Sequence, residues 1–284
     1  MRLNNQRMRT LRQLRKVGLY SFITLVVVTT LYPYLVMLLS SLKSADEINR
    51  MPGTLLPENW VWTNYLEIWK AVPLATYLKN SFLIAAGTTV LAIGCAIPAA
   101  YALSRLEFKG SQLFLGIVVA TQMFSPIILL VGIYDLAVKV HLNDSILGLI
   151  LVNGGFNQAF AIWVLWGTFE SISIGLEEAA MIDGCSRFRA LRKVTLPLAA
   201  PGIVTALIFV FINGWNEYTL AFTVIASENK KPLTVGINAF FGYTNIKWWY
   251  LFAVCLVAAV PVIILFSVIE KRLVSGLTTG AEKG

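Results

Sequence analysis

Polar side chains that could bind a ligand interrupt the apolar runs of this 284-residue sequence. Side-chain amides, carboxylates and hydroxyls form hydrogen bonds, which suits contact with an uncharged, hydroxyl-rich ligand. Buried amides also stabilise bundles of membrane helices through interhelical hydrogen bonds, so both roles stay open. The candidates are Gln122, Asn153, Asn157, Gln158, Asn213, Asn216, Glu217 and Tyr218.

Groups for covalent or acid–base catalysis are scarce in the sequence. His141 is the only histidine, and no nucleophile, base and orienting group occur together. We interpret Cys95, Cys185 and Cys255 as packing residues, without a disulfide framework or a metal-ligand cluster. A phosphate-binding G-x-x-x-x-G-K-[S/T] loop is also absent. We therefore expect a protein that is not an enzyme and binds no metal.

The composition indicates a membrane protein. Hydrophobic residues make up 57% of the chain and charged residues only 13%, whereas a soluble domain has about 25% charged residues. The net charge of +8 is not concentrated in a compact basic domain, so we expect no nucleic-acid partner. The positive charge is better suited to fixing the orientation of the chain in a bilayer.

The apolar runs predict an all-α, polytopic fold with six transmembrane helices. Each run is long enough to cross roughly 30 Å of hydrocarbon as a helix, and Glu217 is the only formal charge within them. The first run exceeds the apolar core of a signal peptide and is expected to remain as an uncleaved helix. The predicted spans are residues 17–42, 81–104, 113–134, 145–168, 199–222 and 248–269.

The distribution of Lys and Arg predicts that both termini are cytoplasmic. Arg2, Arg7, Arg9, Arg12, Arg15 and Lys16 precede the first span, and further basic residues cluster in 170–197 and 270–284. This orientation gives a cytoplasmic N-terminus over 1–16, a six-helix domain over 17–269 and a cytoplasmic tail over 270–284. The domain includes a first outer loop, 43–80, and a cytoplasmic segment, 170–197.

Five prolines fall within the predicted spans, and each removes a backbone donor and can bend its helix. They are Pro33, Pro98, Pro126, Pro201 and Pro261. Static kinks and mobile hinges are both consistent with them.

The cytoplasmic segment 170–197 contains two short helical patterns separated by Asp183-Gly184. Glycine adopts the left-handed conformation that ends a helix, and Ser186 can cap the next helix. Ala179 and Ala180 form a smooth surface that another protein could approach closely. An amphipathic segment resting on the membrane is the alternative.

The spacing in this segment resembles a known motif. Glu178-Ala179-Ala180, Gly184, Val194, Leu196 and Pro197 match the EAA pattern of permease subunits of binding-protein-dependent ABC importers. Over nearly the whole chain the sequence is similar to the MalG-type subunit of carbohydrate importers. The similarity includes Ser41-Leu42-Lys43, Asn64-Tyr65, Asn80-Ser81, Trp215-Asn216-Glu217 and the terminal residues 272–284.

The resemblance implies a MetI/MalG-like fold and a set of partners. They are a second permease subunit, two ATP-binding subunits that hold ATP and Mg, an extracytoplasmic solute-binding protein and a sugar. It places the chain in the bacterial cytoplasmic (inner) membrane, in contact with lipid and without a bound cofactor of its own. ATPase coupling would involve Glu178, Ala179, Ala180, Asp183, Gly184, Gly276 and Gly280. Binding-protein contact would involve Gly242, Tyr243, Thr244 and Asn245, although this loop could also be simply solvated.

The function expected from this resemblance is ATP-driven import of a sugar or oligosaccharide, with this chain forming half of the pathway. A permease for a non-sugar solute is one alternative. An ion-coupled secondary carrier is another, but such carriers usually have repeated halves and several intramembrane ionisable groups.

Overall fold

A computed structural model describes residues 2–106, 108–242 and 246–281, with side chains for 13, 15–106, 108–242 and 246–267. In these ranges the chain is helical, and the one isolated β-bridge joins Phe241 and Ile246. The chain divides into two units, Met1–Ala71 with Phe240–Val257 and Val72–Ala239 with Ala258–Gly284, which we call unit 1 and unit 2. The expected all-α class is confirmed.

Unit 1 holds α1 (Arg2–Ser41), α2 (Ala45–Ile48), α3 (Asn64–Ala71) and the first part of α14 (Trp248–Ala281). Hydrogen bonds close the loop between α1 and α3. The Asn64 side chain donates to the carbonyl oxygens of Ser41 and Lys43 at 2.9 and 3.0 Å, and the backbone N–H of Val61 donates to Leu42 at 2.8 Å. Residues 61–64 of the predicted first outer loop are therefore held against residues 41–43 at the end of α1.

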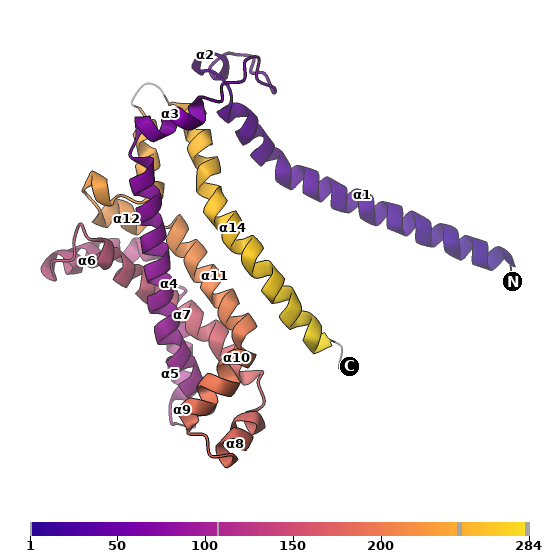
Figure 1. The fold of residues 1–284 in the computed structure, drawn as a ribbon, viewed down its shortest axis with the longest axis vertical. Coiled ribbons are helices and arrows are strands. Elements are labelled where there is room, and N and C mark those ends of the chain that lie inside the picture. The colour runs from indigo at the N-terminus through magenta and orange to yellow at the C-terminus, as the bar shows by residue number, and fades with distance from the viewer. Residues whose placement is uncertain (1, 107, 243–245, 282–284) are drawn as a thin grey trace. The chain divides into compact units, whose positions relative to one another are not determined.

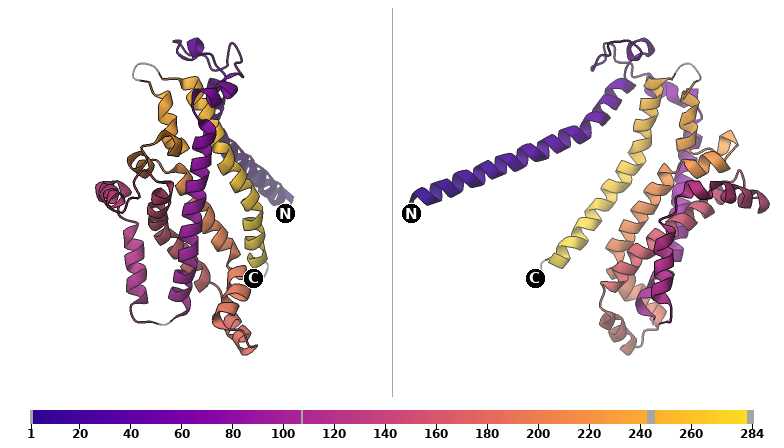
Figure 2. Two further views of the ribbon diagram at one scale, coloured as in Figure 1. Left: turned by 60° about the vertical axis from the view of Figure 1, so that its left-hand side comes forward. Right: turned by 180° about the vertical axis from the view of Figure 1, so that it is seen from behind.

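Unit 2 is built around three long helices that lie side by side: α4 (Leu74–Arg105), α7 (Ile146–Glu170) and α11 (Ala200–Asn216) (Figures 1 and 2). The buried face of α4 is rich in small residues, including Ala85, Ala92, Ala96 and Ala100. Small side chains let membrane helices approach closely. At Gly214 of α11 an added Cβ would lie 3.0 Å from the Ala85 backbone, so this crossing requires a small residue.

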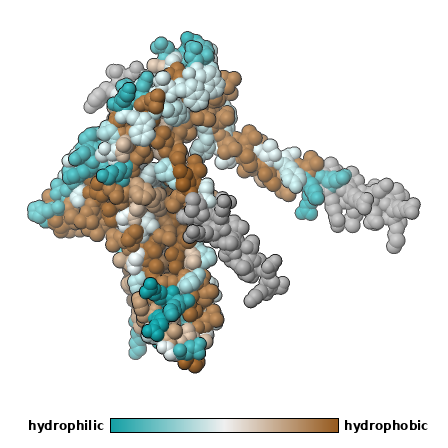
Figure 3. Space-filling view, viewed as in Figure 1, coloured by the Kyte–Doolittle hydropathy of each residue, from teal (hydrophilic) through white to brown (hydrophobic). Residues whose placement is uncertain are grey.

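Shorter helices surround this core. They are α5 (Ser111–Thr121), α6 (Pro126–Lys139), α8 (Ile174–Ile182), α9 (Arg187–Ala190), α10 (Leu196–Leu198), α12 (Thr219–Val224) and α13 (Leu233–Gly236). A π-helical turn, η1 (Leu191–Thr195), joins α9 to α10, and the 3-10 turns η2 (Glu228–Lys230) and η3 (Ile237–Phe240) flank α13. Figure 3 shows apolar side chains over the long helices of unit 2 and hydrophilic ones near α9.

Four helices in the described part of the chain are long and apolar enough to cross a membrane: Arg15–Ser41, Leu74–Arg105, Ile146–Glu170 and Trp248–Ser267. The count rises to six if each of two bent helix pairs is one span. The helix expected from residue 81 begins earlier, at Leu74, and α14 continues beyond 269 to Ala281.

The stretch 113–134, expected as one span, forms two helices, α5 and α6, with a sharp break before Pro126. The chain bends by 95° between α5 and α6, because Pro126 offers no backbone donor and the preceding residue, Ser125, is extended. The span expected over 199–222 is also interrupted. It meets the preceding helix, Arg187–Leu198, at 75°, and α11 ends before Glu217, which has an extended backbone.

Candidate functional site

A polar cavity of about 350 Å³ lies in unit 2 where α5, α6, α7, α11 and α12 approach one another. Five of the eight ligand-binding candidates line it: Gln122, Asn153, Asn157, Asn213 and Glu217. Thr121, Ser125 and Thr219 add hydroxyls, and Phe124 and Phe156 add aromatic faces. Among the described residues that line the cavity, none is Lys, Arg or His. The cavity therefore suits an uncharged polar ligand.

The amides of the cavity also connect its walls. Asn213 on α11 donates to the Asn157 side chain at 3.2 Å, and Asn157 donates to the carbonyl oxygen of Asn153 at 2.9 Å. Gln122, at the break after α5, donates to the carbonyl oxygen of Phe156 at 3.1 Å. The Asn213–Asn157 and Gln122–Phe156 contacts join different elements, as amides that pack helices do, whereas the Asn157–Asn153 contact lies within α7.

Asn153 differs from the other amides because its Nδ2 is buried without a hydrogen-bond partner among the described residues. Its side chain is on α7, and the residue is only 2% exposed. A buried donor without a partner is unfavourable, so a ligand or a bound water at this position would be stabilised.

Glu217 joins α11 to α12 and also lines the cavity. Its two carboxylate oxygens accept hydrogen bonds from the backbone N–H groups of Leu220 and Ala221 at 2.7 and 2.9 Å. Its own carbonyl oxygen accepts from the Thr234 hydroxyl at 2.7 Å. The intramembrane acid therefore caps the helix after the break, a role that its position in the sequence does not reveal.

The other three candidates are not among the residues that line this cavity. Asn216 and Tyr218 are exposed, and the Tyr218 hydroxyl accepts a hydrogen bond from the Asn238 side chain at 3.1 Å. Gln158 is half-buried on α7. Of the expected binding-protein contacts, Gly242 is exposed, and Tyr243, Thr244 and Asn245 lie outside the described residues.

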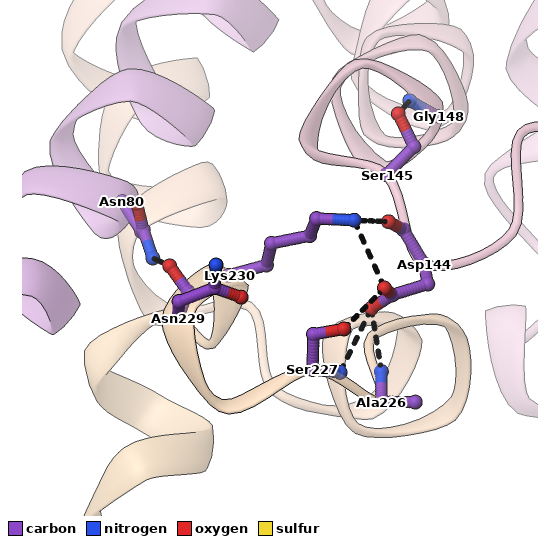
Figure 4. Close-up of polar contacts among 8 residues, drawn as sticks. All are labelled: Asn80, Asp144, Ser145, Gly148, Ala226, Ser227, Asn229 and Lys230. Atoms are coloured by element: carbon purple, nitrogen blue, oxygen red, sulfur yellow. Dashed lines mark hydrogen bonds and ion pairs between the residues drawn. The ribbon is translucent and has the colours of Figure 1, made fainter.

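Sequence reasoning missed a polar cluster around Asp144, which follows the α6 helix (Figure 4). Its carboxylate accepts hydrogen bonds from the backbone N–H groups of Ala226 and Ser227, from the Ser227 hydroxyl and from Lys230. Hydrogen bonds from Ser227, aided by Lys230, hold the pKa of Asp144 well below its usual range. The same segment, residues 226–231, also contacts α4, because the Asn80 side chain donates to the carbonyl oxygens of Asn229 and Lys231, both at 3.0 Å.

The two helical patterns predicted in 170–197 are present as α8 and a helix that begins at Arg187. Gly184 between them has φ +87°, and Ser186 accepts a hydrogen bond from the Arg189 backbone N–H at 3.4 Å. The coupling residues expected in this segment are accessible to a partner: Glu178, Ala179, Asp183 and Gly184 are exposed, and Ala180 is half-buried.

Apolar side chains surround these residues. Ile182 is 86% exposed and Phe188 is 73% exposed, and Ile174 and Leu176 are also exposed. Exposed apolar side chains next to small residues are typical of a surface that another protein or a membrane covers. Gly276 and Gly280, the other two residues expected to couple, lie in the helical backbone of α14, beyond the described side chains.

Glu177, the neighbour of the exposed Glu178, is buried and forms an ion pair with Arg105 at 2.7 Å. The Tyr101 hydroxyl also donates to the Glu177 carboxylate, at 2.9 Å. Burial raises the pKa of Glu177, but the hydrogen bonds from Arg105 and Tyr101 outweigh it, so the pKa lies below its usual value. Neighbouring side chains on a helix point in different directions, so only one of Glu177 and Glu178 can face the core, but nothing in the sequence identifies Arg105 as the partner.

Comparison with known proteins gives consistent similarities. A family model described as the binding-protein-dependent transport system inner membrane component matches residues 89–279. The inner membrane ABC transporter permease protein YcjP of Escherichia coli is 34% identical over 275 residues, which cover 96% of this chain and 98% of that protein. The sulfoquinovosyl glycerol transport system permease protein SmoH of Agrobacterium fabrum is 38% identical over 261 residues, which cover 92% of each.

The fold is similar to that of a solved structure. It is the crystal structure of a bacterial ABC transporter involved in the import of the acidic polysaccharide alginate, and the matched chain gives a TM-score of 0.77 at 26% identity. The match covers 91% of this chain and 96% of the other.

Proposed function

Because the chain belongs to the family of binding-protein-dependent transport system inner membrane components, we propose that it is a MalG-type permease subunit of an ATP-driven importer for a sugar or oligosaccharide. The observation that carries this proposal is the family match together with the exposed EAA segment on α8. The chain is a multi-pass membrane protein without an ATPase site of its own.

A sugar is the substrate class that the cavity suits best. Amide and hydroxyl groups match sugar hydroxyls, and aromatic faces match the C–H surface of a sugar ring. The relative named for sulfoquinovosyl glycerol transport and the importer of alginate support a carbohydrate substrate. Alginate is acidic, whereas the described cavity lining holds no basic residue, so an uncharged sugar fits this cavity better. The substrate pathway then includes Gln122, Asn153, Asn157, Asn213 and Glu217, with Gln158, Asn216 and Tyr218 nearby in sequence.

The proposed partners follow from this role. A second permease subunit completes the pathway, and two ATP-binding subunits hold ATP and Mg, so this chain binds no cofactor itself. An extracytoplasmic solute-binding protein delivers the sugar to the outer side, where Gly242 to Asn245 contact it. The chain lies in the cytoplasmic membrane with both termini inside the cell.

Coupling to the ATP-binding subunits would run through Glu178, Ala179, Ala180, Asp183 and Gly184. The exposed apolar residues beside them support a protein surface at this point. Gly276 and Gly280 would reach the same subunits from the C-terminal helix.

Purification and transport assays test the proposal. A tagged chain should co-purify with an ATP-binding protein and a second permease, and proteoliposomes of the complex should take up sugar only with ATP and the solute-binding protein. Uptake by this chain alone, driven by an ion gradient, would instead establish a secondary carrier. ATP-dependent uptake of a non-sugar solute, with no sugar taken up, would establish the other alternative.

A further inference from the structure

A buried ion pair ties the exposed α8 segment to the core of unit 2. Arg105 is the last residue of α4, and its Nε lies 2.7 Å from the Glu177 carboxylate, 72 positions later in the sequence. The two side chains are only 5% and 3% exposed. Since Glu178 is exposed, neighbouring acids on α8 face opposite ways, one toward the core and one toward solvent.

Arg105 holds a third element as well. Its Nη2 donates to the carbonyl oxygens of Phe169 and Ile172, both at 2.9 Å, at the C-terminal end of α7. A guanidinium group has a planar array of donors, so its contacts fix direction as well as distance. One side chain therefore connects the end of α4, the end of α7 and the start of α8.

The chain that connects α8 to α11 is not one continuous helix. Gly184 follows α8 with φ +87°, and the helix Arg187–Leu198 contains the π-helical turn η1 before it meets α11 at 75°. Such joints can absorb a displacement, and π-helical turns often occur at functional sites. The ion pair, in contrast, leads directly into α4, a helix of 32 residues that packs along α7 and α11.

A role beyond stability fits the energetics of buried charges. Buried ion pairs often stabilise a fold no better than apolar residues of similar size, because desolvation offsets the attraction. What the pair adds is a fixed geometry between its elements.

We propose that Arg105 and Glu177 are positioning residues that make α8 and the adjoining ends of α4 and α7 one rigid body, so that a displacement of α8 moves α4. This inference rests on the proposed function, in which the ATP-binding subunits move α8. It assigns the transmission step to two residues that are not themselves part of the exposed docking surface.

The test uses the complete transporter in proteoliposomes, carrying Glu177→Gln or Arg105→Lys. Asp135→Asn is the matched control, since Asp135 forms an exposed ion pair with Lys139 on α6. We expect both test variants to assemble and hydrolyse ATP, while sugar uptake per ATP falls about tenfold, within the range usual for coupling between sites. The control should couple as the wild type does.

A distance measurement gives a readout that a purely stabilising role would not change. Spin labels are placed at Ile182→Cys on α8 and Val90→Cys on α4, both exposed sites, with the three native cysteines replaced by alanine. In the otherwise wild-type complex the label-to-label distance should be the same with and without ATP. In the Glu177→Gln complex it should change when ATP binds.

Several results would overturn the proposal. They are normal uptake per ATP in an assembled Glu177→Gln complex, a nucleotide-dependent distance in the wild type, or a nucleotide-independent distance in the variant. If the single variants fail to assemble, the double variant Arg105→Gln/Glu177→Gln, which leaves no unpaired buried charge, takes their place. Failure of this double variant to assemble would assign the pair to folding alone.

The proposed function is tested separately by the wild type. A wild-type complex without sugar-stimulated ATP hydrolysis would reject that function. Normal coupling in the variants would reject only the role of the ion pair.

Discussion

Lys230 binds both the side chain and the backbone of Asp144: its Nζ lies 2.9 Å from the carboxylate and 2.7 Å from the carbonyl oxygen. Asp144 has φ +48°, an unusual conformation for a residue with a side chain. The contact joins the loop before α7 to the segment after α12. The conformation of Asp144 is thus maintained by residues more than eighty positions away.

Asp144→Asn should destabilise the protein by about 1–3 kcal/mol at pH 7. The amide replaces one acceptor oxygen with an NH2 group, which would face the donors that now bind the carboxylate. The pKa of Asp144 is lowered in the folded state, so its contribution is complete above the unfolded pKa of about 3.9 and declines as pH falls through the folded pKa. Thermal unfolding in detergent at several pH values measures this. A wild-type-to-variant difference that is the same at pH 7 and in acid would contradict it.

Asn153→Leu should weaken sugar binding without weakening the fold. The substitution removes the buried Nδ2 that lacks a partner among the described residues, so thermal stability should be equal or higher. Loss of one hydrogen bond to the sugar should raise the KM for uptake by roughly threefold to tenfold. A lower melting temperature with an unchanged KM would instead assign Asn153 to helix packing.

Glu217→Gln should impair uptake at a normal expression level. Glutamine keeps one acceptor oxygen, so it can retain only one of the two backbone contacts to α12, and Glu217→Ala retains neither. Loss of a helix cap costs about 1 kcal/mol. Melting temperatures should therefore fall in the order wild type, Glu217→Gln, Glu217→Ala. Wild-type uptake by the Glu217→Gln variant would rule out a role of this carboxylate in transport.

Gly184→Ala should reduce the amount of ATP-binding subunit that co-purifies with the chain. No atom lies within 4 Å of the added Cβ, so the effect comes from the left-handed backbone, which costs about 1–2 kcal/mol for a residue other than glycine. Gly175→Ala is the control on α8, where the Cβ would meet only Ser173 at 3.6 Å. Equal co-purification with both variants would show that the turn does not set the docking geometry.

Gly148→Ala should lower thermal stability by about 1–3 kcal/mol, as overpacking does. The added Cβ would lie 2.3 Å from the carbonyl oxygen of Leu142, a backbone atom that cannot rotate away. Gly155→Ala in the same helix is the matched control, because nothing lies within 4 Å of its Cβ. Equal melting temperatures for the Gly148→Ala and Gly155→Ala variants would contradict the prediction.

Local patterns in the sequence predicted the helical architecture and the form of segment 170–197. Apolar run length identifies helices that can span a bilayer, and Asp183-Gly184 marks a turn whose positive φ the structure contains. The four-residue spacing of Asn153 and Asn157 also predicted that they share one face of a helix, and they lie one turn apart on α7.

The effect of each proline was less predictable, because it depends on its neighbours. Pro126 lies at a sharp break and Pro201 lies next to the 75° bend. Pro33, Pro98 and Pro261, in contrast, sit inside continuous helices. Packing of the surrounding helices decides whether the lost hydrogen bond bends the chain.

Long-range polar pairs could not be found from the sequence. Neither Arg105 nor Asp144 is among the functional residues that the sequence singled out. Their partners, Glu177 and Lys230, are 72 and 86 positions away. No periodicity links such residues, since their meeting depends on how α4 and the later segments pack.

The 95° break at residues 122–125 is a stretch of backbone that lipid acyl chains cannot solvate. A bend of this size leaves peptide groups outside the regular helical ladder, and acyl chains cannot hydrogen-bond with them. Water or another protein surface must therefore shield this stretch from the acyl chains.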